Sequence, residues 1–165
     1  MPRLHSFELL PDEAGRDAVL RDWQSLRDAG LPSQLDHQGM TNTPHVTVLS
    51  AASLDGVHDD HATACLFPVL PVMARASGLA LLGGTRVSIV RLVDVPDELT
   101  SAVLRLRTEV PHSQHPGWLP HVTLARRVPR SEVPTALGVL GHDDVTLRLV
   151  ELRRWDPDAG TVRTL

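Results

Sequence analysis

The amino-acid sequence predicts an α+β fold of two similar lobes, each an antiparallel sheet with helices on its outer face, enclosing a central cleft. Two observations lead to this prediction. Each half of the chain shows the pattern strand, helix, strand, helix, strand, and the third element of each half contains the tetrapeptide Pro-His-Val-Thr. The halves join at Gly83 and Gly84 without a linker, so we expect a single bilobal domain with lobes at about residues 1–82 and 85–165.

The first half contains five predicted elements. Apolar residues at helical spacing indicate a first helix, which Asp12 can cap and Gly30 ends. Pro68 makes the end of the second helix uncertain. In chain order we expect a strand over residues 3–10, a helix over 12–29, a strand over 44–49, a helix over 57–70 and an extended segment over 72–82.

The second half repeats this order. β-branched residues indicate its first strand, and Pro96 opens a helix with one apolar face. Apolar residues alternate from Val145 to Leu149, but Leu152 breaks the alternation, so we expect a bulge near Val150. The predicted elements are a strand over residues 85–93, a helix over 96–110, a strand over 120–124, a helix over 131–140, a strand from 145 and a closing strand over 161–165.

The composition excludes several classes of protein. The chain has 165 residues and 18.0 kDa, of which 42% are hydrophobic and 22% charged, so it can bury one core. Sixteen basic and twenty acidic residues give a net charge of −4, which argues against a protein that coats long duplex DNA. The same charge is compatible with a small anionic ligand held by a few local cations.

Cysteine content and apolar runs limit the cellular context. Cys65 is the single cysteine, which excludes an intramolecular disulfide and a cysteine-rich metal site. No apolar run approaches the roughly 18 residues that span a membrane, and residues 1–5 lack the apolar core of a signal peptide. We therefore expect a cytoplasmic monomer that binds no membrane, needs no cofactor and has no metal site.

The repeated tetrapeptide carries the residues suited to catalysis. On a strand, residues i and i+2 point to the same face, so His45 projects with Thr47, and His121 projects with Thr123. If a pseudo-two-fold axis relates the halves, the two pairs face each other across the cleft. Two imidazoles suit general acid and base catalysis near neutral pH, and two hydroxyls can donate to phosphate oxygens. We interpret these residues as a catalytic set that requires no metal.

Two H-x-T motifs in a duplicated chain of this length resemble the 2H phosphoesterase superfamily, which includes LigT-like 2′-5′ RNA ligases and 2′,3′-cyclic nucleotide phosphodiesterases. The stretch PHVTLAR at residues 120–126 is similar to the second motif of that family, and NTPHVT at residues 42–47 resembles the first. The resemblance implies a LigT-like fold and a metal-independent phosphodiesterase that acts on 2′,3′-cyclic phosphates or 2′-5′ linkages of RNA ends or nucleotides. It also implies that the two histidines are the acid–base pair and that the two threonines hold the phosphate.

Two further residues are candidates for substrate binding. The resemblance places Arg126 at the phosphate, whereas strand alternation places it opposite His121 and gives the shared face to Arg127. A bulge or the end of the strand after Thr123 would reconcile the two, and we expect Arg126 to be the ligand. Trp118, in the loop before the second motif, can either stack on a nucleobase or fill core space.

Several alternatives stay open. The two near-identical motifs do not distinguish the acid from the base, nor hydrolysis from ligation, and they do not name the physiological substrate. The same cleft would serve a non-catalytic module that binds nucleotides or RNA ends, although intact histidines in both motifs favour catalysis. His58 and His61, at helical spacing, suggest a metal hydrolase, but the acidic residues between them are ordinary at a helix start.

Overall fold

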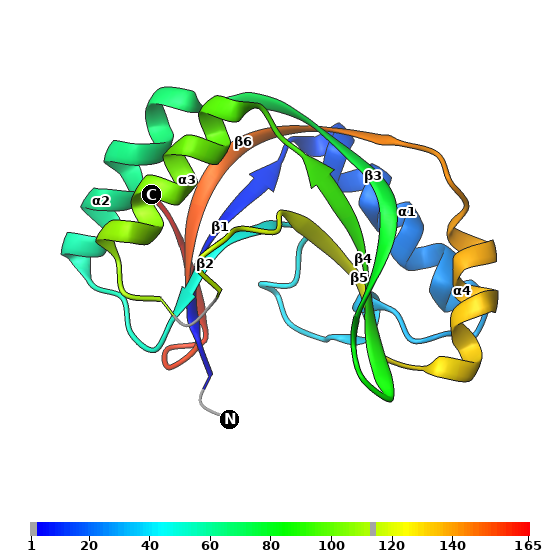
Figure 1. The fold of residues 1–165 in the computed structure, drawn as a ribbon. Coiled ribbons are helices and arrows are strands. Elements are labelled where there is room, and N and C mark those ends of the chain that lie inside the picture. Colours follow the sequence, from blue (N-terminus) through cyan, green and yellow to red (C-terminus); the bar gives the residue numbers. More distant parts are fainter. Residues whose placement is uncertain (1–2, 113–114) are drawn as a thin grey trace.

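The computed structural model describes residues 3–112 and 115–165, which form one curved antiparallel sheet with helices on its outer side (Figure 1). The sheet has seven strands in the order β2-β1-β6-β3-β4-β5, with β7 paired to β6. The strands are β1 (His5–Pro11), β2 (Val46–Ala51), β3 (Val72–Gly83), β4 (Arg86–Asp94), β5 (His121–Pro129), β6 (Val145–Asp156) and β7 (Thr161–Thr164). The helices are α1 (Glu13–Asp28), α2 (Gly56–Leu66), α3 (Asp97–Glu109) and α4 (Val133–Leu140), with 3₁₀ turns at Gln34–Asp36, Phe67–Val69 and Arg130–Glu132. The predicted α+β class is confirmed.

The last strand of each half of the chain lies beside strands of the other half. β6 pairs with β1, and β3 pairs with β4, which gives two equivalent units, β2-β1-β6 and β5-β4-β3. The units join where Val72–Ala76 of β3 pairs with residues 145–149 of β6, so the two predicted sheets are continuous. Helices from different halves of the chain also pack together. α1 contacts α4 at one end of the arch, and α2 contacts α3 at the other end (Figure 1).

Local signals explain where α1 and α2 begin. Asp12 caps α1 by accepting a hydrogen bond from the Gly15 amide at 3.0 Å, and Asp55 caps α2 in the same way. The bulge expected near Val150 is confirmed, because Leu10 pairs with Glu151 while the next residue pairs with Leu149. None of the helices in the described residues has the length and apolar character needed to cross a bilayer.

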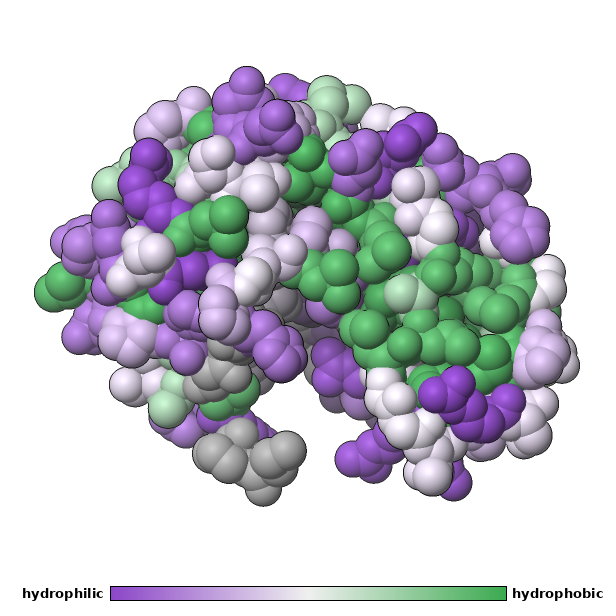
Figure 2. Space-filling model, in the orientation of Figure 1, coloured by the Kyte–Doolittle hydropathy of each residue, from purple (hydrophilic) through white to green (hydrophobic). Residues whose placement is uncertain are grey.

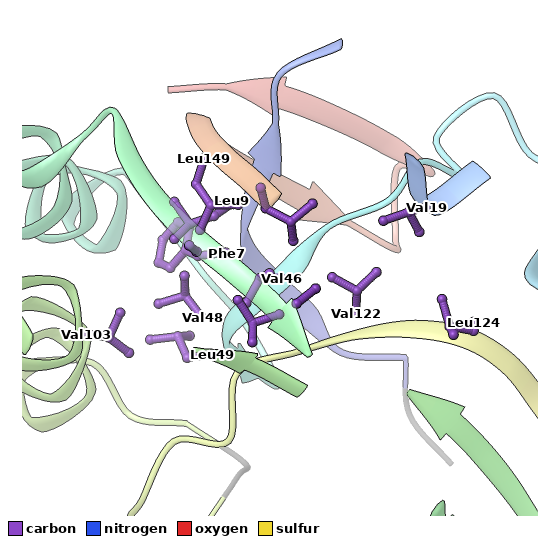
Figure 3. Close-up of a cluster of buried hydrophobic side chains, with 14 of the residues drawn as sticks. Phe7, Leu9, Val19, Val46, Val48, Leu49, Val103, Val122, Leu124 and Leu149 are labelled. Carbon is purple, nitrogen blue, oxygen red and sulfur yellow. The ribbon is translucent and has the colours of Figure 1, made fainter. Parts of the chain in front are cut away.

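The core lies between the outer face of the sheet and the helices. Figure 3 shows Phe7 and Leu9 of β1, Val46 and Val48 of β2 and neighbouring side chains packed in one cluster. Each fully buried side chain of this size contributes about 1.5–3 kcal/mol relative to an exposed one. Because valines of the two motif strands are buried in this core, the side chains that alternate with them are held on the concave face of the sheet.

Candidate active site

Two cavities adjoin on the concave side of the sheet. A polar cavity of about 660 Å³ is lined by His45, Thr47 and Arg126 among other polar side chains. An apolar cavity of about 850 Å³ is lined by Thr47, His121 and a group of largely apolar residues: Leu82, Pro116, Gly117, Trp118 and Leu119. Since Thr47 lines both cavities, they meet at the first motif. The two histidines therefore stand in the walls of neighbouring cavities.

Both imidazoles are oriented by the same kind of main-chain contact. Nδ1 of His45 lies 2.8 Å from the carbonyl oxygen of Thr43, and Nδ1 of His121 lies 2.7 Å from that of Leu119. A carbonyl oxygen only accepts, so each Nδ1 must carry the hydrogen. In the neutral ring, Nε2 then keeps its lone pair for chemistry. The two rings are thus aimed alike, each by the residue two positions before it.

The histidines sit at neighbouring strand starts. His45 directly precedes β2, which begins later than the strand predicted over residues 44–49, and His121 is the first residue of β5. The two strands lie close together without pairing, so the sheet is not closed. Figure 3 shows Val46 and Val122, the residues that follow the histidines, within the same core region. β2 and β5 are the first and last strands of the sheet order, and the curvature of the sheet brings them and their motifs close together.

Matching bulges follow the two threonines. Glu8 of β1 pairs with Thr47 but the preceding β1 residue pairs with Leu49, and the pairing of β5 with β4 shifts likewise between Thr123 and Ala125. Each bulge reverses the alternation, which turns the residue five positions after the histidine toward the polar cavity. That residue is Ser50 in the first motif and Arg126 in the second.

The bulge decides which arginine faces the predicted site. Arg126 lines the polar cavity together with His45 and Thr47. Arg127 instead takes a positive φ of 57°, and its carbonyl accepts a hydrogen bond from the Arg86 guanidinium at 3.1 Å. Of these two arginines, Arg126 is the one that lines the polar cavity, as expected for the residue predicted to bind phosphate.

Tryptophan side chains donate hydrogen bonds to the main chain of both motifs. Nε1 of Trp118 donates to the main-chain oxygen of Thr47 at 2.9 Å, and Nε1 of Trp23 on α1 donates to that of Thr123 at 3.1 Å. Trp118 packs against the core and also lines the apolar cavity beside His121, and its stacking on a nucleobase stays a prediction. Thr123, by contrast, is not among the described residues that line either cavity.

A buried ion pair beneath His45 was not predicted from the sequence. Oε2 of Glu8 lies 2.7 Å from Nε of Arg153, and both side chains are less than a tenth exposed. Oε1 of Glu8 accepts a hydrogen bond from Ser6 at 2.8 Å and lies 3.7 Å from Nε2 of His45. Arg153 also donates to the main-chain oxygen of Thr41 at 3.1 Å. The floor of the polar cavity is therefore a hydrogen-bonded, charge-balanced network.

Arg107 of α3 fixes the wall around His121, and sequence patterns gave no signal for it. Its guanidinium donates to the Val48 carbonyl at 2.8 Å, to that of Gly117 at 2.9 Å and to that of His115. Burial lowers the pKa of the Arg107 guanidinium from its ordinary value. An arginine stays charged even so, and these carbonyl contacts tie the loop before the second motif to β2.

The histidine pair considered for a metal site serves other purposes. Nδ1 of His58 accepts from the Asp55 amide within a capping box, and Nδ1 of His61 lies 2.9 Å from a Glu109 carboxylate oxygen. The metal-hydrolase alternative therefore loses its support. Within the described ranges, the residues close enough to share an ion are His5, Asp156 and Asp158.

Comparisons with known proteins place this arrangement in a known fold. No protein-family model matches the sequence, and no curated protein matches it either. The structure is similar to E. coli LigT complexed with 3′-AMP, at 13% identity and a TM-score of 0.57, over 99% of this chain and 94% of that chain. E. coli LigT complexed with NADP+ gives 15% and 0.55, and a crystal structure of a phosphoesterase gives 14% and 0.52, with the same coverage. The chain has a LigT-like fold, as the sequence predicts.

Proposed function

We propose that this protein is a metal-independent phosphodiesterase that acts on 2′,3′-cyclic phosphates or 2′-5′ phosphodiester linkages of RNA ends or nucleotides. The observation that carries the proposal is the pair of imidazoles on neighbouring strand starts. Each has Nδ1 bonded to a main-chain carbonyl and Nε2 left for proton transfer. Such a pair supplies one proton acceptor and one proton donor, which is the requirement for breaking a phosphodiester bond.

The proposed step on a 2′,3′-cyclic phosphate moves two protons. A water oxygen attacks phosphorus while Nε2 of His121 takes a proton from that water. The bond from phosphorus to the ribose 3′ oxygen breaks, and the imidazolium of His45 gives its proton to the leaving oxygen. The product is a 2′-phosphate, and proton exchange with solvent resets the pair. The exchanged assignment of the two histidines uses the same geometry and stays an alternative.

The other predicted residues would hold the phosphate. Thr47, which carries a hydroxyl, lines both cavities, and Arg126 supplies a cation to the polar cavity. Together with Thr123 they would donate to the non-bridging oxygens, where negative charge develops. We assign the apolar cavity to a nucleobase, with Trp118 as the aromatic wall. The E. coli LigT structures with 3′-AMP, NADP+ and phosphate support a nucleotide-type ligand for this fold.

The decisive experiment incubates the protein with EDTA and a panel of adenosine and uridine 2′,3′-cyclic phosphates, 2′-5′ dinucleotides and RNA ending in a cyclic phosphate. We expect conversion to 2′-phosphates or cleaved dinucleotides, detected by mass spectrometry. Matched His45→Ala and His121→Ala variants, shown to be folded by circular dichroism, should lack this conversion. Binding of a nucleotide without conversion, unchanged in both variants, would favour the binding-module alternative.

A pH profile separates the paired-histidine mechanism from metal hydroxide chemistry. One imidazole must be neutral and the other protonated, so kcat/KM should be bell-shaped, and its two limbs belong to the pair jointly. A rate that rises steadily into the alkaline range and disappears with EDTA would contradict the proposed mechanism.

A further inference from the structure

The outer part of β3 has a free edge. β3 pairs with β6 only over Val72–Ala76, and it pairs with β4 from Arg75 to Gly83. Within the ranges that the structure describes, no strand pairs with the other edge of residues 79–83. A free edge exposes main-chain donors and acceptors that can bond to a further strand.

The equivalent edge in the other half is covered by the chain itself. β6 continues past its pairing with β3, and there β7 pairs with it from Arg153 to Asp156. The amide of Leu165 also donates to the carbonyl of Leu152 at 3.0 Å. Leu152 is 1% exposed, whereas its equivalent in the repeat, Leu79, is only half-buried. The duplication thus shows that an antiparallel strand fits this kind of edge.

The positions of Leu79 and Leu152 are equivalent by strand register. Leu79 lies beside Arg91 of β4, which lies beside the valine of the second motif. Leu152 lies beside Leu9 of β1, which lies beside the valine of the first motif. Leu79 at the free edge and Leu152 at the covered edge can therefore be compared directly.

Beyond the bulge at Ser77–Leu79, the free edge lacks the charged side chains and prolines that usually prevent strand addition. Residues 77–84 read SGLALLGG, without charge or proline. Leu79 and Leu81 are half-buried, and Val139 of the neighbouring α4 is 36% exposed. Figure 2 shows hydrophobic side chains gathered in one patch over β3 and α4. An uncharged edge beside an apolar patch is suited to a protein partner.

We propose that this edge pairs with the same edge of a second copy of the chain, β3 against β3 in antiparallel orientation. Antiparallel pairing of identical edges is closed by a two-fold axis, so it covers both free edges at once and stops at a dimer. It also brings together two uncharged segments, whereas a strand such as β7, which carries Arg163, adds a charge. The proposal replaces the monomer expected from the sequence and does not depend on the proposed activity.

Sedimentation velocity over a broad range of concentration tests the dimer. We expect the unaltered protein to be dimeric at high concentration and to dissociate on dilution. Leu81→Lys should raise the dissociation constant about 100-fold or more, because the two-fold axis brings two added ammonium groups together. Met73→Lys is the matched control. Met73 lies on the same strand and is 53% exposed, but it belongs to the part that pairs with β6, so this variant should remain dimeric.

Hydrogen exchange on the unaltered protein tests the location without any substitution. Those amides of residues 79–83 that face away from β4 should become protected as concentration rises, whereas amides of Val72–Ala76 should show no change. A sedimentation coefficient of a monomer at every concentration would overturn the proposal. A dimer with no concentration-dependent protection in residues 79–83, or one that Leu81→Lys leaves intact, would overturn it as well.

Discussion

The His45 and His121 sides of the candidate site share their main-chain geometry. In both, the imidazole is bonded through Nδ1 to the carbonyl two residues earlier, and a bulge follows the threonine. In both, the bulge turns the residue five positions after the histidine toward the polar cavity, Ser50 on one side and Arg126 on the other. The duplication has therefore preserved the backbone that aims the two rings.

The floors beneath the two motifs differ in charge. Glu8 pairs in register with the threonine of the first motif, and Val90 pairs with that of the second. Arg153 lies beside Glu8, whereas Ala80 lies beside Val90. One motif thus stands on a buried ion pair and the other on two apolar side chains. The comparison teaches that the orientation of the two imidazoles and the charge of the floor beneath them are set by different residues. Each side of the site is therefore suited to a different chemical group.

The largest expected effect tests whether the two sides act as one unit. His45→Ala or His121→Ala should lower kcat by roughly 10²–10⁴-fold, because each removes a positioned proton-transfer group. The double variant should lose less than the product of the two single losses. Steady-state kinetics on the best substrate, with thermal unfolding as the folding control, measures both. Fully multiplicative losses would show that the two rings act independently.

Exchange of the charged floor tests the difference between the sides. Glu8→Val should lower the free energy of unfolding by about 3–5 kcal/mol, because it leaves the Arg153 guanidinium buried without its carboxylate. The double variant E8V/R153A copies the Val90 and Ala80 pair of the other side, so it should recover much of that loss. Urea unfolding of Glu8→Val, Arg153→Ala and the double variant gives the coupling free energy between the two side chains. Purely additive losses would mean that the ion pair does not act as a unit.

A smaller effect should separate two adjacent arginines. Arg126→Ala should lower kcat/KM by roughly 10–100-fold, since it removes charge-assisted hydrogen bonds to the phosphate. Arg127→Ala is the matched control, because its side chain is exposed and its φ of 57° stays equally unfavourable for alanine. Ser50→Ala shows whether the equivalent position of the first motif also contacts substrate. Equal, minor effects of the two arginine substitutions would remove Arg126 from the site.

The threonines should contribute similar amounts. Thr47→Ala and Thr123→Ala should each cost ~1.5–3 kcal/mol of transition-state binding if both hydroxyls donate to the phosphate. Thr47 lines both cavities, whereas Thr123 lines neither, so a much smaller loss for Thr123→Ala would assign phosphate binding to one side alone. Values of kcat/KM for the two variants, with Thr→Ser as the conservative control at each position, measure this difference.

The smallest expected effect concerns the turn that leads to β7, the strand without a counterpart in the repeat. Hydrogen bonds from the amides of Ala159 and Asp158 lower the pKa of the Asp156 carboxyl below its usual range. A lowered pKa in the folded state stabilises the protein above the ordinary aspartate range, and this contribution is lost as pH falls through the folded value. The free energy of unfolding should therefore fall in acid, and Asp156→Asn should make that fall shallower. Urea midpoints across the acid range measure it.

The order of the elements was predictable because local signals determine it. Asp12 and Pro96 mark helix starts, and the broken alternation at Leu152 reports the bulge at Val150. The two catalytic candidates were predictable because an identical motif recurs in equivalent elements. These features depend on residues that are close in sequence, so a single chain displays them.

The rest of the site depends on partners far apart in the chain. The face of Arg126 follows from a shift in the pairing of β5 with β4, which strand alternation alone predicts wrongly. Glu8 and Arg153 are 145 positions apart, and only the pairing of β1 with β6 brings them together. Strand exchange between the halves was not expected either, because a repeat is equally compatible with two self-contained sheets.

The exchange of β3 and β6 has a consequence for the ancestry of the chain. A polypeptide with only one repeat would possess strands equivalent to β1 and β2 but would obtain the third strand of its sheet from another molecule. It would therefore be complete only as a symmetric pair of chains, each donating its last strand to the other. In the present chain, covalent linkage of the repeats makes that donation intramolecular. Such linkage also allows the two floors to diverge, since a substitution in one repeat no longer appears in both.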